Sequence, residues 1–215
     1  MSKQIKIDFV SDVSCPWCVI GLKSLEQAVE RIGDVATVDL HFQPFELNPA
    51  MGPQGQDIGE HLTEKYGTTP AQINQTREMI RARGAEVGFH FEMAARSRIY
   101  NTFDAHRLLH WADLQGRQHA LKMALFEVYF SQGESPASHE VLIRVAGEVG
   151  LDTAEAARIL ASDTYAAEVR EHQRYYLEQG INSVPAIIIN ERHLISGGQA
   201  PEVFEQALRS IIAQD

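Results

Sequence analysis

The chain has 215 residues, of which 44% are hydrophobic and 22% charged, and its formal net charge is −10. This composition is ordinary for a folded globular protein with a substantial core. The negative charge argues against nucleic acid as a partner, because phosphate binding requires clustered Lys and Arg, and it gives no reason to expect an anionic membrane surface as a partner.

The first predicted element is a buried strand over residues 5–10, where apolar residues alternate and then run together. The residues at the start of the chain show no apolar run long enough for a signal peptide. No apolar run anywhere approaches the length of about 18 residues that a membrane-spanning helix needs. We therefore expect a cytoplasmic protein. In that compartment disulfides are usually transient and catalytic.

The only two cysteines of the chain, Cys15 and Cys18, follow this strand and begin a helical pattern. If Cys15 directly precedes the helix and Cys18 lies in its first turn, both sulfurs share one face. Residues at that spacing are neighbours about 5–6 Å apart on a helix, close enough for a disulfide to form and break. Pro16 suits the first helical position, which needs no backbone N–H. The unpaired N–H groups and the positive end of the helix dipole would then favour a Cys15 thiolate. A thiolate beside a second thiol suffices for dithiol–disulfide exchange.

Three other interpretations of the cysteine pair are weaker. A structural disulfide closing so small a loop would contribute only ~2 kcal/mol, against ~3 for a fifteen-residue loop. A structural zinc site needs four ligands, and none of the nine histidines forms a pair at the usual offset from the cysteines. Accidental proximity is the third. Redox chemistry fits best, and we predict no metal and no cofactor.

The helical pattern after the cysteines runs through Leu22, Leu25, Val29 and Ile32, and Gly33 is placed to end it. A second strand is predicted over residues 37–42. The short strand–helix–strand connection favours a right-handed parallel pair. Residues 44–56 then read as a loop rich in proline and glycine.

The middle of the chain is predicted to be helical for more than a hundred residues. Apolar stripes at helical spacing indicate helices around residues 57–66, 70–87, 102–115, 118–131, 138–149 and 153–160. A further helix, marked by Tyr165, Val169, His172 and Tyr176, is ended by Gly180. An antiparallel hairpin follows, with strands over 184–189 and 193–196, and a helix over 201–212 closes the chain.

This order is β-α-β, a helical block, and then α-β-β-α. Without the block it is the pattern of a thioredoxin fold, with C-x-x-C where that fold carries its active site. We therefore predict an α/β protein, a thioredoxin fold with a large all-helical insertion. Residues 1–56 and 164–215 would form the thioredoxin-like domain, and residues 57–163 the inserted helical domain.

The chain resembles the DsbA family of thioredoxin-fold proteins, and within it the cytosolic FrnE-like branch. The residues that carry the resemblance are spread over nearly the whole length: Asp12-Val13-Ser14-Cys15-Pro16-Trp17-Cys18, Ile20-Gly21, Pro44-Phe45-Glu46-Leu47-Asn48-Pro49, Asn101-Thr102, Ala105-His106-Arg107-Leu108, Gly180-Ile181-Asn182-Ser183-Val184-Pro185 and Ser196-Gly197-Gly198-Gln199.

The resemblance implies roles for six residues. Cys15 and Cys18 would be catalytic, Cys15 as the attacking thiolate and Cys18 as the resolving thiol. Pro185 resembles the cis-proline that faces the active site in thioredoxin folds, although a proline leading an edge strand is an alternative. Val184 would offer its backbone to an extended substrate. Pro16 and Trp17 complete the expected substrate-binding residues.

The residues between the cysteines differ from the better-known family members. Pro16 and Trp17 include no histidine to hold the thiolate, so the helix terminus must do so alone. Trp17 would either help to recognise apolar substrate segments or pack against the insertion.

Other polar residues are weaker candidates. Asn101, with Asp104, is typical of a helix cap, or could point toward the cleft between domains. His106 is more typical of a satisfied core histidine than of a catalytic base. Glu46 and Asn48 would either approach the sulfurs, as proton carrier or substrate contact, or lie in a solvated loop.

The sequence thus predicts a thiol–disulfide oxidoreductase acting on protein or small-molecule disulfides. Glutathione or a thioredoxin-type protein would be the recycling partner. One alternative is a glutathione-dependent transferase or isomerase of the kappa-class or hydroxychromene-carboxylate-isomerase type, although those enzymes carry serine at the position matching Cys15. The other is a non-catalytic client-binding module.

Overall fold

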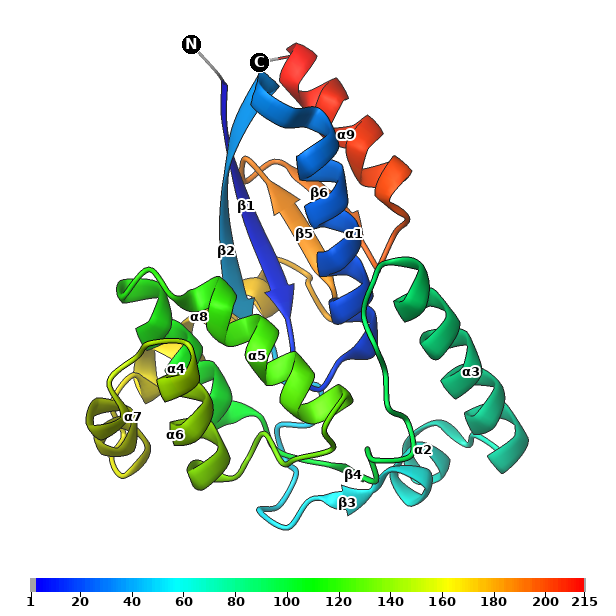
Figure 1. Cartoon of the computed structure of the whole chain (residues 1–215), viewed down its shortest axis with the longest axis vertical. Coiled ribbons are helices and arrows are strands. Elements are labelled where there is room, and N and C mark those ends of the chain that lie inside the picture. Colours follow the sequence, from blue (N-terminus) through cyan, green and yellow to red (C-terminus); the bar gives the residue numbers. More distant parts are fainter. Residues whose placement is uncertain (1–2, 215) are drawn as a thin grey trace.

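The computed structural model describes residues 3–214, and its centre is a four-stranded sheet. The strands are β1 (Lys3–Ser11), β2 (Ala36–Pro44), β5 (Ala186–Ile189) and β6 (His193–Ser196), in the order β2-β1-β5-β6 (Figure 1). The β1–β2 pair is parallel, as predicted, and the β1–β5 and β5–β6 pairs are antiparallel.

Helices cover the two faces of this sheet. Helices α1 (Pro16–Ile32) and α9 (Pro201–Gln214) pack side by side on one face (Figure 1), and α8 (Ala166–Glu178) packs against β2. Alternation along β1 explains the division, because successive side chains of a strand point to opposite faces. Ile7 and Phe9 join the buried cluster that contains α1 and α9, whereas Val10 packs with Tyr176 of α8.

The segment between β2 and α8 is mainly helical. It contains α2 (Ile58–Tyr66), α3 (Pro70–Glu86), α4 (Phe103–Leu114), α5 (Gln118–Phe130), α6 (His139–Glu148) and α7 (Thr153–Leu160). The prediction of a thioredoxin fold with a large helical insertion is confirmed. Two features are additional. Strands β3 (Gln56–Asp57) and β4 (Arg98–Ile99) form a short antiparallel ladder, and Gly33 ends α1 but begins a 3-10 turn (Gly33–Val35).

The hydrophobic core crosses the predicted domain boundaries. The cluster that contains β1 and α1 also includes six residues of the insertion: Ile80, Phe89, Phe91, Phe126, Tyr129 and Phe130. A second cluster lies mainly among α4, α5, α6 and α7. We retain the division into residues 1–56 with 164–215 and residues 57–163 as a proposal.

Helix α5 is attached to the sheet and to α1 by its first turn. The side-chain amide of Gln118 accepts the backbone N–H of Phe42 at 2.8 Å and donates to the Phe42 carbonyl at 3.0 Å. These bonds occupy the free edge of β2. The neighbouring His119 contacts Glu26 of α1 at 2.6 Å. The position of α5 relative to the cysteines is therefore fixed.

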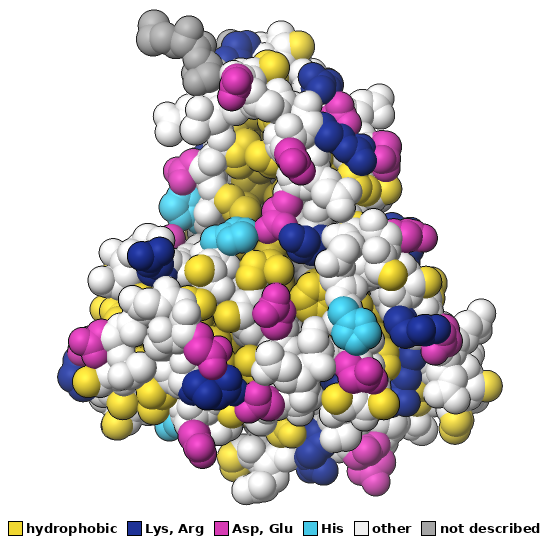
Figure 2. Space-filling model, in the orientation of Figure 1, with side chains coloured by type: hydrophobic (Ala, Val, Ile, Leu, Met, Phe, Trp, Pro, Cys, Tyr) yellow, Lys and Arg dark blue, Asp and Glu magenta, His cyan; other side chains and the backbone are white. Residues whose placement is uncertain are grey.

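The surface carries charges of both signs. Figure 2 shows acidic and basic side chains interspersed over the helical part of one face rather than gathered into a basic area. In residues 3–214, none of the helices combines the length and the apolarity that crossing a membrane would require.

Candidate active site

Cys15 and Cys18 lie where the sequence places them, at the start of α1. Cys15 is the N-cap residue, Pro16 occupies the first turn, and the backbone N–H of Cys18 donates to Cys15 Sγ at 3.2 Å. Both cysteines are unbridged thiols. An N–H group at a helix N-terminus stabilises negative charge on the sulfur that it contacts.

Cys18 is fully buried, and its surroundings oppose ionisation. Burial raises the pKa of the Cys18 thiol well above its usual range, and the hydrogen bond and charge of Cys15 raise it further. The backbone of Asp12 and the charge of Lys122 act in the opposite direction. Cys18 is therefore protonated, as a thiol. Cys15, in contrast, lies at the N-terminus of α1, where backbone N–H groups favour negative charge.

The structure brings Val184 and Pro185 to the cysteines from the far end of the chain. The Val184 carbonyl oxygen lies 3.8 Å from Cys15 Sγ, and the Val184–Pro185 peptide bond is cis, as the resemblance implied. Pro16, Trp17 and Val184 are partly exposed, whereas Pro185 is buried. The six residues singled out from the sequence thus surround one position at the start of α1.

Cys15 is less accessible than an attacking thiol is expected to be. Only 3% of its surface is exposed, and it belongs to the large buried cluster, against which Trp17 and Val184 pack. A substrate sulfur can reach Cys15 Sγ only after some of the covering atoms move.

Two glycines allow the Pro185 segment to approach α1 closely. A Cβ atom at Gly21 would lie 3.1 Å from Cγ of Pro185 and 3.2 Å from Cα of Gly198. A Cβ atom at Gly198 would lie 2.8 Å from the carbonyl oxygen of Trp17, which is closer than van der Waals contact permits. Glycine at these positions lets the loops before and after the β5–β6 hairpin lie against the first turns of α1.

Asp12 fixes the loop that carries Cys15, a role that sequence reasoning did not assign. Its backbone carbonyl accepts the Cys15 N–H at 3.2 Å, and its buried carboxylate accepts the N–H groups of Leu47 at 2.7 Å and Ser14 at 3.3 Å. Burial raises the pKa of Asp12, but the hydrogen bond and charge of His106, with the Leu47 N–H, outweigh burial and lower it. An Asp two residues before a serine at a turn was the available sequence signal.

His106 is a satisfied core histidine, as the sequence suggested. It is 3% exposed, and its Nε2 atom lies 3.0 Å from the Phe45 carbonyl oxygen and 3.5 Å from Asp12 Oδ1. It therefore positions Asp12 from α4.

Lys122 of α5 is the second residue that sequence reasoning missed. It is fully buried, and burial lowers its pKa to about 8, against the opposing charges of Cys18, Asp12 and Cys15. The sequence signal was a lysine within the apolar stripe of a helix, one turn before Phe126.

The weaker candidates serve as structural contacts. Glu46 is not in a solvated loop: its carboxylate is buried against α8, where it contacts Arg170 and accepts a hydrogen bond from Gln173 at 3.0 Å. Asn48 accepts a hydrogen bond from Lys65 at 2.8 Å. Asn101 accepts the Phe103 N–H at 2.9 Å, but it lies one residue before the N-cap of α4, which is Thr102.

The expected partner of Asn101 does not complete a capping box. Asp104 instead contacts Arg107 and His139, both at 2.8 Å. Asn101 also donates toward Glu46 at 3.4 Å, so it links the start of α4 to the loop after β2.

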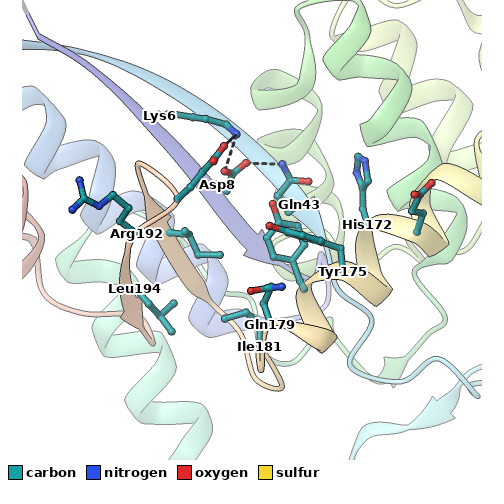
Figure 3. A pocket seen from close by; sticks show the side chains of 13 residues that line it. Lys6, Asp8, Gln43, His172, Tyr175, Gln179, Ile181, Arg192 and Leu194 are labelled. Atoms are coloured by element: carbon teal, nitrogen blue, oxygen red, sulfur yellow. Dashed lines mark hydrogen bonds and ion pairs between the residues drawn. The ribbon is translucent and has the colours of Figure 1, made fainter.

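A cavity of about 710 Å³ lies elsewhere, and neither cysteine lines it. Figure 3 shows it between the sheet and α8, with Asp8 held by Lys6 and Gln43 on one side and His172 and Tyr175 on the other. The candidate active site is therefore the start of α1 and not this cavity.

The chain matches known proteins over nearly its whole length. Residues 6–209 match the model of the DSBA-like thioredoxin domain. The protein YwbO of Bacillus subtilis is 26% identical over 205 residues, 95% of this chain and 96% of that protein. The structure of a probable DsbA oxidoreductase from Streptomyces coelicolor is 32% identical with a TM-score of 0.92, covering 98% of this chain and 91% of that one.

A more distant match shares the fold alone. The cytosolic disulfide reductase DsbM of Pseudomonas aeruginosa, solved with glutathione, has a TM-score of 0.67 at 17% identity, covering 97% of this chain and 99% of that one.

Proposed function

Since the chain belongs to the DsbA-like thioredoxin-domain family, we propose that it is a thiol–disulfide oxidoreductase acting on protein or small-molecule disulfides through Cys15 and Cys18. The observation that carries the proposal is the position of Cys15 at the N-cap of α1, with the Cys18 N–H on its sulfur and Val184 facing it. We place the protein in the FrnE-like branch and in the cytoplasm.

The proposed reaction has two displacement steps. The Cys15 thiolate attacks one sulfur of a substrate disulfide, forming a mixed disulfide and releasing the other substrate sulfur as a thiolate. Cys18 then loses its proton and attacks Cys15 Sγ, so that the Cys15–Cys18 bond forms as the bond to the substrate breaks. The substrate is reduced and the cysteine pair is oxidised. The reverse sequence oxidises a dithiol.

The same geometry supports a substrate site at Pro16, Trp17, Val184 and Pro185. An extended substrate segment would lie beside Val184 and make backbone contacts there, as an added strand does. The partly exposed indole of Trp17 would contact apolar substrate side chains. Because Cys15 is 3% exposed, atoms that cover its sulfur have to move during this step.

Glutathione or a thioredoxin-type protein is the proposed recycling partner. The fold shared with the DsbM structure, which contains glutathione, supports the first of these. One glutathione thiolate would attack the Cys15–Cys18 disulfide, forming a mixed disulfide and freeing one cysteine. A second glutathione would then attack the glutathione sulfur of that mixed disulfide, so that the other cysteine is released and oxidised glutathione forms.

Cysteine variants test the assignment of roles. We expect Cys15→Ser to abolish reduction of a model disulfide, and Cys18→Ser to retain a mixed disulfide at Cys15 that mass spectrometry detects. Reduction by Cys15→Ser at the parental rate would overturn the proposal.

Turnover of an electrophile with glutathione by the double Cys→Ser variant would instead indicate the transferase or isomerase alternative. Binding of unfolded clients that needs neither cysteine would indicate a non-catalytic module.

A further inference from the structure

Lys122 is a buried amine without a partner. None of its surface is exposed, and within residues 3–214 its Nζ atom has no hydrogen-bond partner. Its nearest ring contacts are Phe126, at 5.0 Å from Nζ to the ring centroid, and Phe42, at 5.7 Å. Burying an ammonium destabilises the folded state unless a nearby negative charge or hydrogen-bond acceptor compensates. A buried titratable group with a shifted pKa is also a candidate functional residue.

Helix α5 holds this amine in place. Gln118, one turn earlier on the same face, is bonded to both backbone groups of Phe42, and His119 is bonded to Glu26 of α1. Residues four apart on a helix lie on one side, so Lys122 shares with Gln118 the side of α5 that contacts Phe42 of β2.

The two rings that Lys122 contacts, Phe42 and Phe126, belong to the same buried cluster as Cys15 and Cys18, and the charges that act on the pKa of Lys122 are those of the candidate active site. They are, in decreasing order of influence, Cys18, Asp12 and Cys15. Asp12 already has its own donors, the N–H groups of Leu47 and Ser14, besides His106. Cys18 differs, because Lys122 is the cationic side chain that favours its ionised form.

A cavity of about 60 Å³ adjoins Lys122 on the side of the insertion. The titratable groups that line it with Lys122 come from two other helices, α4 and α8: His106, His110, Asp113 and His172. A space of this volume can hold a few waters.

We propose that the ammonium of Lys122 stabilises the Cys18 thiolate and thereby promotes resolution of the mixed disulfide; this inference rests on the proposed function. In this step the Cys18 thiol gives its proton to water, and the thiolate attacks Cys15 Sγ. The electron pair of the broken bond leaves on the substrate sulfur. Lys122 acts through its charge, so it is a positioning residue.

The direct test is a pH titration of Cys18 in full-length protein that carries Cys15→Ala. The ultraviolet absorbance of the thiolate is the readout. Adding Lys122→Met removes the charge and keeps an unbranched apolar side chain, so the variant is expected to fold. We expect it to lower the acid dissociation constant of Cys18 about tenfold or more, the effect of one pKa unit. Lys3→Met, which removes an exposed lysine at the end of β1 far from the cysteines, is the matched control and leaves the titration unchanged. Identical titrations with and without Lys122 overturn the inference.

A kinetic measurement separates this inference from the proposed function. Cys15 is loaded with thionitrobenzoate as a mixed disulfide, and its release by Cys18 is followed at neutral pH. We expect Lys122→Met to slow release about tenfold, while alkylation of Cys15 in a Cys18→Ser background keeps its rate. Equal release rates overturn the role of Lys122. If the parental protein does not release the label, the proposed function is overturned. In that case the Cys18 titration still tests whether Lys122 stabilises the Cys18 thiolate.

Discussion

At the scale of residues, the burial of the Lys122 ammonium near the cysteines lowers the free energy of unfolding. Lys122 is buried among aromatic rings, and within residues 3–214 no acceptor lies within hydrogen-bond distance of its amine. An ammonium in this position lowers the free energy of unfolding, because the unfolded chain solvates the charge fully. This cost falls in the cluster that also contains Cys18, the thiol that has to ionise in the proposed reaction.

Lys122→Met tests that cost through its pH dependence. The pKa of Lys122 falls from 10.5 to about 8 on folding, so below pH 8 the folded state carries the full penalty, about 3 kcal/mol. Between pH 8 and 10.5 the unfolded chain binds more protons than the folded one, and the penalty disappears as pH rises. We expect Lys122→Met to be more stable than the parent in denaturant unfolding at pH 7, by an amount that shrinks toward pH 10. A difference that is constant over this range would contradict the burial of a charged amine.

The sequence reveals these residues unequally. Cys15, Pro16 and Cys18 were predictable because the signals of a helix start are local. Pro185 and Val184 could be assigned only through the resemblance, since the chain brings them to Cys15 across 169 residues. His106 was predicted as a satisfied core histidine, but Asp12 and Lys122 were missed, because their roles depend on how α4 and α5 pack against the strands.

At the scale of elements, the site depends on the close contact between the start of α1 and the loops around the β5–β6 hairpin. Gly21 and Gly198 face each other across this contact, and neither has space for a side chain without displacing a neighbour. The contact holds Pro185 near the cysteines.

Gly198→Ala tests the contact. Its Cβ atom would lie 2.8 Å from the Trp17 carbonyl oxygen, and backbone cannot move aside as a flexible side chain can. We expect a loss of about 1–3 kcal/mol in the free energy of unfolding and faster alkylation of Cys15, because the covering loops separate from α1. Gly52→Ala is the control, since a Cβ atom there meets nothing within 4 Å. Equal stability of the two variants would show that the loop is not held by this contact.

Elements with a long periodic pattern were predictable, and short ones were not. The helices of the insertion and the strands of the central sheet lie close to their predicted ranges because their apolar spacing repeats. Strands β3 and β4 have two residues each, too few for any periodic signal. The attachment of α5 to the edge of β2 depends on one amide side chain, Gln118, and has no signature in the sequence.

At the scale of the whole molecule, the shared core links the two proposed domains. Phe91 and Phe126 of the insertion belong to the same buried cluster as Phe9 and Leu22. The topology was predictable from the order of the elements along the chain, but that order could not show that the insertion completes the core around α1.

This shared core predicts one cooperative unfolding transition. The chain offers one tryptophan in each part, Trp17 in α1 and Trp111 in α4. We expect the fluorescence of Trp17→Phe and of Trp111→Phe to report thermal transitions that coincide with loss of helix in the same variant, since neither part retains its core without the other. Separate transitions for the two parts would show that the insertion is an independent folding unit.

The central claim is that Cys15 and Cys18 form and break a bond reversibly at the start of α1. An equilibrium titration of the full chain against glutathione redox buffers measures this directly, with free thiols and adducts counted by mass spectrometry. We predict a single reversible change between two thiols and an intramolecular disulfide, and only a glutathione adduct in Cys18→Ser. Absence of the intramolecular bond at every buffer ratio in the parental protein would contradict the account.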